Sequence, residues 1–165
     1  MARESTGRDE TPEERADRNL NELLQELRVA LPGVQVLFAF LLTVPFSQNF
    51  SKLNEGQQKL YSGVLIATTL ATALLIAPTA HHRLLFRQGD KEHLVTISNR
   101  YAIIGLGVLG TAIGGGLFQI GDYLYGTATT VIVTGAIGSV FVTVWYVLPL
   151  YRRSQLRRSE RGEGT

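Results

Sequence analysis

Three histidines, His81, His82 and His93, fall within 13 residues and are the side chains best suited to hold a metal ion or relay a proton. Adjacent residues on a helix point about 100° apart, so His81 and His82 do not share one ion as an i, i+4 pair does. A reversal at Gly89 would bring His93 toward His82, but no arrangement of carboxylates strengthens the case for a metal site. We therefore favour surface histidines at a membrane headgroup boundary and expect no metal site.

A second candidate is the pattern Gly105-x-Gly107-x-x-Gly110, which resembles a dinucleotide-binding turn. Such a site needs an amphipathic helix after the glycines and an acid about 20 residues further on. Here three consecutive glycines follow, and Asp122 leads into another apolar run. No serine elbow, H-E-x-x-H or phosphate loop occurs, and cysteine is absent. We expect no catalytic residues, no cofactor and no enzyme activity.

The charged residues of the 165-residue chain, 16 basic and 14 acidic, are distributed very unevenly. A helix that crosses a bilayer needs about 20 mainly apolar residues. The chain has four segments of about that length without charge, residues 29–51, 60–82, 101–121 and 123–151. The sequence thus predicts an all-α polytopic membrane protein, a four-helix transmembrane domain over 31–151 with spans at about 31–46, 60–80, 101–121 and 127–150.

The segments outside these spans have distinct characters. Residues 1–10 are predicted to be a disordered tail. An amphipathic cytoplasmic helix is predicted over 11–30, with Thr11 and Glu14 as a capping box and a stripe of leucines. It packs against the rest of the protein, lies at the membrane surface, or docks a partner. Pro32-Gly33 is expected to break or kink it before the first span.

Further boundaries follow from capping and turn residues. Asn54 is the expected N-cap of the second helix, which should end near Gly89, with Asp90 capping the third. A turn of about five residues around Asp122 should precede the fourth span, and 152–165 form a basic cytoplasmic tail.

The distribution of lysine and arginine indicates on which side of the membrane each segment between the spans lies. Of the 16, 14 lie in segments on one side of the predicted membrane and 2 on the other. The positive-inside rule then places both termini in the cytoplasm and the spans in the plasma membrane. This orientation accounts for the basic pI, so no nucleic-acid partner is expected. The helix at 12–30 and the hairpin at 81–100, with Arg83 and Arg87, are expected to contact anionic lipid or a protein partner.

Glycines within the spans are expected to serve helix packing, because association in lipid depends on close backbone approach. They recur at intervals of four and seven residues, and the set is Gly63, Gly107, Gly110, Gly114, Gly121 and Gly135. Packing within one chain and packing between subunits of a homo-oligomer both stay open.

A transport function requires particular residues in the spans, because coupled carriers usually keep an ionisable residue within the bilayer. None is predicted there. Gln35, Gln119 and Asp122 are the candidates for a transport path, although Asp122 lies at the outer edge and suits a turn or cap. The threonines are expected to bond to carbonyls of their own helices.

The segments QVLFAFLLTVPF, APTAHHRLLFR and SNRYAIIGL resemble a family of small actinobacterial membrane proteins classed as a domain of unknown function. The resemblance extends from about Leu20 to Tyr151, and HRLLFR at 82–87 is its most specific part. It implies four spans with both ends inside, and some members carry a sodium:proton antiporter label. The function predicted here is a non-enzymatic membrane module. The alternative is an ion channel or a cation/proton transporter.

Overall fold

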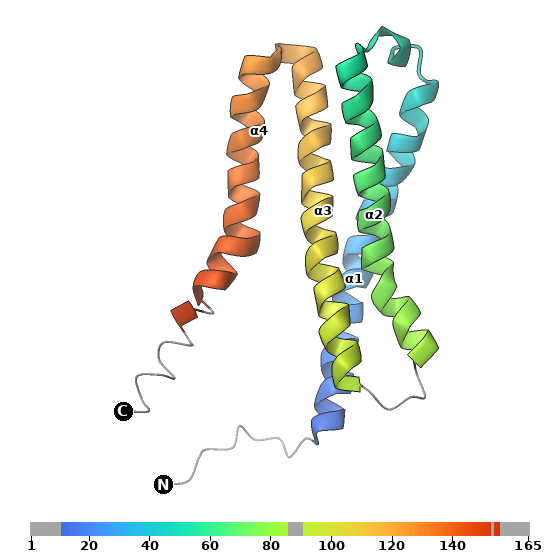
Figure 1. Cartoon of the computed structure of the whole chain (residues 1–165), viewed down its shortest axis with the longest axis vertical. Coiled ribbons are helices and arrows are strands. Elements are labelled where there is room, and N and C mark those ends of the chain that lie inside the picture. The colour runs from blue at the N-terminus through green and yellow to red at the C-terminus, as the bar shows by residue number, and fades with distance from the viewer. Residues whose placement is uncertain (1–10, 86–90, 153, 156–165) are drawn as a thin grey trace.

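The computed structural model describes residues 11–85, 91–152, 154 and 155. Four helices run alternately in opposite directions (Figure 1). Their bounds are α1 Pro12–Thr43, α2 Glu55–Leu85, α3 Lys91–Tyr125 and α4 Thr127–Val142. A π-helical turn, Thr143–Val147, and helical residues 148–152 continue α4 and are counted with it below. Two short 3₁₀ turns, Val44–Phe46 and Phe50–Lys52, join α1 to α2.

All four helices are long and apolar enough to cross a membrane. The described ranges contain no strand. These two observations confirm the predicted all-α polytopic membrane fold. The bundle has two ends. At one end, α1 and α3 begin and α2 and α4 end (Figure 1). We call it the basic end, because Arg83, Arg100 and Arg152 lie there. The opposite end holds residues 44–54 and Gly126, and we call it the loop end.

The core of the bundle lies among α1, α2 and α3, and α4 packs mainly against α3. Its buried members come in pairs from the three helices: Leu27 and Val34, Ala71 and Leu75, Ala102 and Leu109. In contrast, no residue in the most apolar 18-residue stretch of α4 is buried within the chain. An apolar helix this exposed is expected when hydrocarbon surrounds it.

Pro32-Gly33 was predicted to break or kink the helix, and the break is wrong, because α1 continues through both residues to Thr43. Proline removes one backbone hydrogen bond, whereas ending a helix in an apolar medium leaves several groups unpaired. Leu27 and Val34, seven residues apart on either side of Pro32, are both buried in the same core. The amphipathic segment and the first span are therefore one helix.

The N-terminal half of α1 packs against the chain's own α2 and α3. The capping box is confirmed: the Thr11 N–H donates to Glu14 Oε2 at 2.9 Å, and the Glu14 N–H donates to Thr11 Oγ1 at 3.2 Å. Ala16 and Leu20 are buried on the same face as Leu27. Of the three alternatives for residues 11–30, the structure shows packing within the protein.

The turn between α3 and α4 is shorter than the predicted five residues around Asp122. Helix α3 runs to Tyr125, and Gly126 alone reverses the chain with a φ of 81°. A φ in this region is readily adopted only by glycine. Asp122 is consequently a residue of the last turn of α3.

The π-helical turn in α4 was not predicted. Here the Leu148 N–H donates to the Thr143 carbonyl, five residues back. Pro149 follows at once, and a proline ring clashes with the carbonyl four residues before it, which is that of Trp145. The wider turn, which contains Trp145 and Tyr146, relieves this clash.

Several predicted features lie outside the described residues. These are the tail at 1–10, the hairpin residues Gly89 and Asp90, and most of the C-terminal tail at 152–165.

Candidate functional site

A polar cluster at the loop end joins three helices through Asp122. Its Oδ2 accepts a hydrogen bond from Gln57 Nε2 of α2 at 3.0 Å, and its Oδ1 accepts one from the Thr127 hydroxyl at 2.6 Å. Both carboxylate oxygens therefore have a partner. Asp122 thus links α2 and α4 to α3 by side-chain hydrogen bonds, whereas α4 begins after Gly126 without a side-chain cap.

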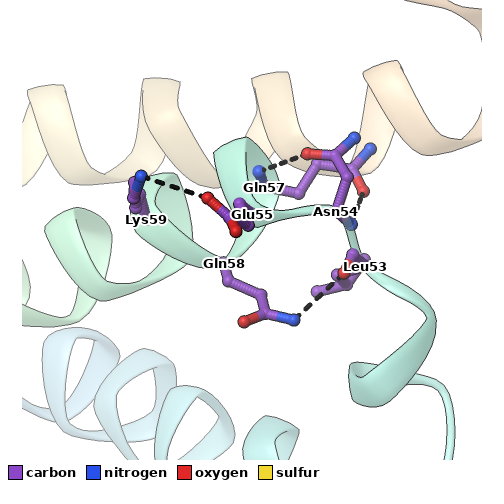
Figure 2. Close-up of polar contacts among 6 residues, drawn as sticks. All are labelled: Leu53, Asn54, Glu55, Gln57, Gln58 and Lys59. Carbon is purple, nitrogen blue, oxygen red and sulfur yellow. Dashed lines mark hydrogen bonds and ion pairs between the residues drawn. The ribbon is translucent and has the colours of Figure 1, made fainter.

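Gln57 connects this cluster to the start of α2. The Gln57 N–H donates to Asn54 Oδ1 at 2.9 Å, and the Asn54 N–H donates to Gln57 Oε1 at 3.2 Å (Figure 2). This reciprocal pair confirms Asn54 as the N-cap. Because the amide oxygen of Gln57 faces Asn54, its nitrogen is left to donate to Asp122. The Gln57 side chain thus takes part in the cap of α2 and also forms a hydrogen bond to α3.

Replacement of Asp122 by alanine is expected to lower the Tm of the detergent-solubilised protein by a few degrees, because two charge-assisted hydrogen bonds between helices are lost. Glu55→Ala is the matched control, since Glu55 is paired with the exposed Lys59 one turn away on the same helix, at 3.5 Å (Figure 2). Equal effects of the two substitutions on the Tm would contradict the conclusion that the hydrogen bonds of Asp122 stabilise the contacts of α3 with α2 and α4.

The structure does not assemble Gln35, Gln119 and Asp122 into one polar path. Gln35 is exposed on α1, whereas Gln119 lines a shallow cavity of about 250 Å³ against residues 44–53 at the loop end. The expectation for the threonines is confirmed for six of them. These donate to carbonyls of their own helices at 2.7–3.0 Å, and they are Thr43, Thr68, Thr69, Thr72, Thr111 and Thr143.

The predicted packing glycines divide into two groups. At three of them, an added Cβ would face a side chain of α4: the Tyr146 hydroxyl at Gly107 (2.5 Å), Trp145 at Gly110 (3.8 Å) and Thr130 at Gly121 (2.8 Å). The other group, with nothing within 4 Å, is Gly63, Gly114 and Gly135.

Two close packing positions were missed by the sequence reasoning. A Cβ on Gly105 would lie 3.0 Å from Leu75, and one on Gly115 would lie 2.7 Å from Val64, so both face α2. Neither belongs to the seven-residue repeat that directed attention to Gly107, Gly114 and Gly121. The α2–α3 contact itself is the information that would have identified them.

An apolar groove of about 510 Å³ lies between α3 and α4. Toward the basic end α4 diverges from α3 (Figure 1). Gly110 and Gly114 of α3 and Gly138 of α4 help to line the groove, and Trp145 and Tyr146 line its part nearest the basic end. Trp145 and Tyr146 both belong to the π-helical turn, and the Tyr146 hydroxyl donates to the Ile103 carbonyl of α3 at 3.4 Å.

The basic end carries exposed arginines from three helices: Arg83 of α2, Arg100 of α3 and Arg152 of α4. Arg83 was predicted as a contact residue, Arg87 lies outside the described residues, and Arg100 and Arg152 were missed. Between His93 and Gln155 the sequence has one acid, Asp122, which is at the opposite end. At the start of α3, Glu92 offsets the charge of Lys91, so the net positive charge of the described part of this end at α2, α3 and α4 is that of the three arginines.

The histidines lie at the same end. The His81 ring stacks at a tilt on Tyr101, with centroids 5.4 Å apart, and its Nδ1 lies 2.9 Å from the Ala77 carbonyl. Ser98 is fully buried nearby on α3, and its hydroxyl has no hydrogen-bond partner. Over the described residues, no group of three or more His, Asp or Glu side chains is placed to hold a metal ion.

The sequence model of a family of unknown function (DUF6328) matches residues 9–149. The chain belongs to this family. The DUF6328 match confirms the predicted family of unknown function and covers all of α1, α2 and α3, and α4 with its π-helical turn. No curated protein and no solved structure matches the chain.

Proposed function

We propose that this DUF6328 protein is a non-enzymatic module of the plasma membrane that contacts anionic lipid through its basic end, with both termini in the cytoplasm. The supporting observation is the exposure of Arg83, Arg100 and Arg152 on three helices at one end of the bundle. Each arginine near an anionic surface contributes about 1 kcal/mol of attraction. The excess of basic residues at this end favours the cytoplasmic orientation.

Anionic lipid suits the exposed charges better than a protein docked on α1. The leucine face of α1 is already covered by α2 and α3. Its remaining surface mixes both signs of charge over 14–28, with the acids Glu14, Asp17, Glu22 and Glu26 beside the bases Arg15, Arg18 and Arg28. Such a mixed face has little net attraction for an anionic membrane, so we assign lipid contact to α2, α3 and α4.

Native mass spectrometry of the detergent-solubilised protein with equal phosphatidylglycerol and phosphatidylcholine tests this proposal. We expect phosphatidylglycerol to be retained preferentially, and the preference to fall about fivefold for each of Arg83, Arg100 and Arg152 changed to glutamine. Arg15→Gln, on the mixed face of α1, is the control and should change little. Equal retention of both lipids by the unmodified protein overturns the proposal and leaves a protein partner as the better reading.

Reconstituted vesicles test the transport alternative. The proposed module gives no more proton or sodium flux than protein-free vesicles. Selective cation flux that disappears in Gln35→Leu or Asp122→Asn would instead establish a transporter or channel. A periplasmic reporter fused at the C-terminus should be inactive if the basic end is cytoplasmic.

A further inference from the structure

The groove between α3 and α4 is a space that the packing of the bundle leaves unfilled. Its volume of about 510 Å³ falls within the ~300–1,000 Å³ range of small-molecule sites. Its walls are apolar over most of their area, and side chains such as Ile137 and Trp145 line it. Because both helices are long enough to span the bilayer, the groove opens at hydrocarbon depth. Its natural occupant is therefore apolar and elongated.

The positive charges at one end of the groove determine which kind of lipid suits it. Gly121 faces Thr130 near the loop end and Gly107 faces Tyr146 near the basic end, which sets an antiparallel register between α3 and α4. Arg100 lies about two turns beyond Gly107, and Arg152 lies nearly two turns beyond Tyr146. This register places both exposed arginines at one level, just past the groove's aromatic end.

We infer that the α3–α4 groove holds one acyl chain of an anionic phospholipid whose phosphate group lies between Arg100 and Arg152. This inference rests on the proposed anionic-lipid function and adds to it a specific site, separate from Arg83. Trp145 and Tyr146 lie between the chain region and the headgroup region, which is where such rings are favoured at membrane interfaces. The phosphate is recognised by two guanidinium groups, which donate charge-assisted hydrogen bonds.

A second copy of this chain fits the groove less well. In a membrane, two copies with the same orientation would bring Arg100 and Arg152 of one close to the same residues of the other. The acid of α3 at this end, Glu92, lies about two turns from Arg100, and Asp122 lies at the loop end, so neither acid is beside the two arginines. A lipid phosphate neutralises these charges, whereas a second copy doubles them.

Trp145 is the only tryptophan in the chain and lines the groove, so its fluorescence reports on the occupant directly. The experiment adds phosphatidylglycerol with brominated acyl chains, or the matching phosphatidylcholine, to the detergent-solubilised full chain. Bromine quenches tryptophan only at short range. We expect the brominated phosphatidylglycerol to quench Trp145 at a concentration about 25-fold lower, which corresponds to about fivefold for each arginine.

Five variants distinguish lipid binding in the groove from lipid binding elsewhere on the protein. Gly114→Leu should reduce the quenching because leucine would occupy the groove, whereas Gly116→Leu should not. Neither position has an atom within 4 Å of an added Cβ, and only Gly114 lines the groove. Arg100→Gln and Arg152→Gln should each weaken the preference about fivefold. Arg83→Gln should leave the quenching of Trp145 unchanged.

Equal quenching by the two lipids, or an equal response of Gly114→Leu and Gly116→Leu, overturns the inference. A dimer whose Trp145 is shielded from both brominated lipids also overturns it and identifies a second copy as the occupant. Native mass spectrometry shows which idea has failed. If phosphatidylglycerol is still retained preferentially, the proposed function stands and only the groove assignment is wrong. If the preference is absent there too, both are wrong.

Discussion

Replacement of Gly115 by leucine is expected to lower the free energy of unfolding by about 3 kcal/mol, the upper part of the usual range for overpacking. A Cβ at this position would lie 2.7 Å from Val64 Cγ2, and Val64 is itself buried with 5% exposure. Val64 therefore has no free space to move into, and α2 and α3 would have to separate. Thermal melting in detergent, followed by circular dichroism, should show a fall in Tm of about 6–12 °C.

The adjacent Gly116 supplies the control for this experiment. Nothing lies within 4 Å of its added Cβ, so leucine meets no obstacle there. Leucine is also the better helix former by about 1 kcal/mol. Gly116→Leu should melt at or slightly above the Tm of the unmodified protein. If both variants lost stability equally, the cause would be the chemistry of leucine near residue 115 and not the α2–α3 contact.

Truncation of Leu75 to alanine is the second substitution with a large expected effect. Leu75 is fully buried, packs in the core shared by α1, α2 and α3, and lies 3.0 Å from the Cβ position of Gly105. In lipid the unfolded helix also sits in hydrocarbon, so the lost transfer energy is small and the cavity carries most of the cost. We expect a loss of about 2 kcal/mol, at the low end of the range for buried leucine.

Leu70→Ala is the matched control, because Leu70 lies on the same helix with 54% exposure and should cost little. A second variant tests the mechanism. Gly105→Ala alone should destabilise the protein, but in the Leu75→Ala background its methyl group should fill part of the cavity. The two effects should therefore be non-additive when unfolding is measured by a double-mutant cycle. Additive losses would show that Leu75 and Gly105 do not share this contact.

Some residues of the candidate site could be predicted from local sequence, and others could not. The N-cap at Asn54 follows from local sequence, because a capping side chain bonds to backbone within three residues. The hydrogen bond from Gln57 to Asp122 joins residues 65 apart, so no local pattern contains it. In the same way, Arg83 was found from its place beside a span, whereas the importance of Arg100 and Arg152 depends on the register between α3 and α4.

The glycines show the same limit. Their spacing indicated that helices pack closely, but it did not show which neighbour each one faces. Gly105 and Gly115 face α2, Gly107 and Gly121 face α4, and Gly114 faces an open groove. A helix presents several faces, and periodicity along one chain does not assign them to partners.

By itself the sequence determined that the protein has four membrane-spanning helices, because uncharged segments of sufficient length are stable as helices in hydrocarbon, where each backbone group must be paired. Only the tertiary structure decided that α1 continues through Pro32, that Gly126 alone turns the chain, and that α4 diverges to leave a groove. These outcomes depend on contacts between residues distant in the chain. Solvation by lipid is a property of each segment, whereas packing is a property of pairs of helices.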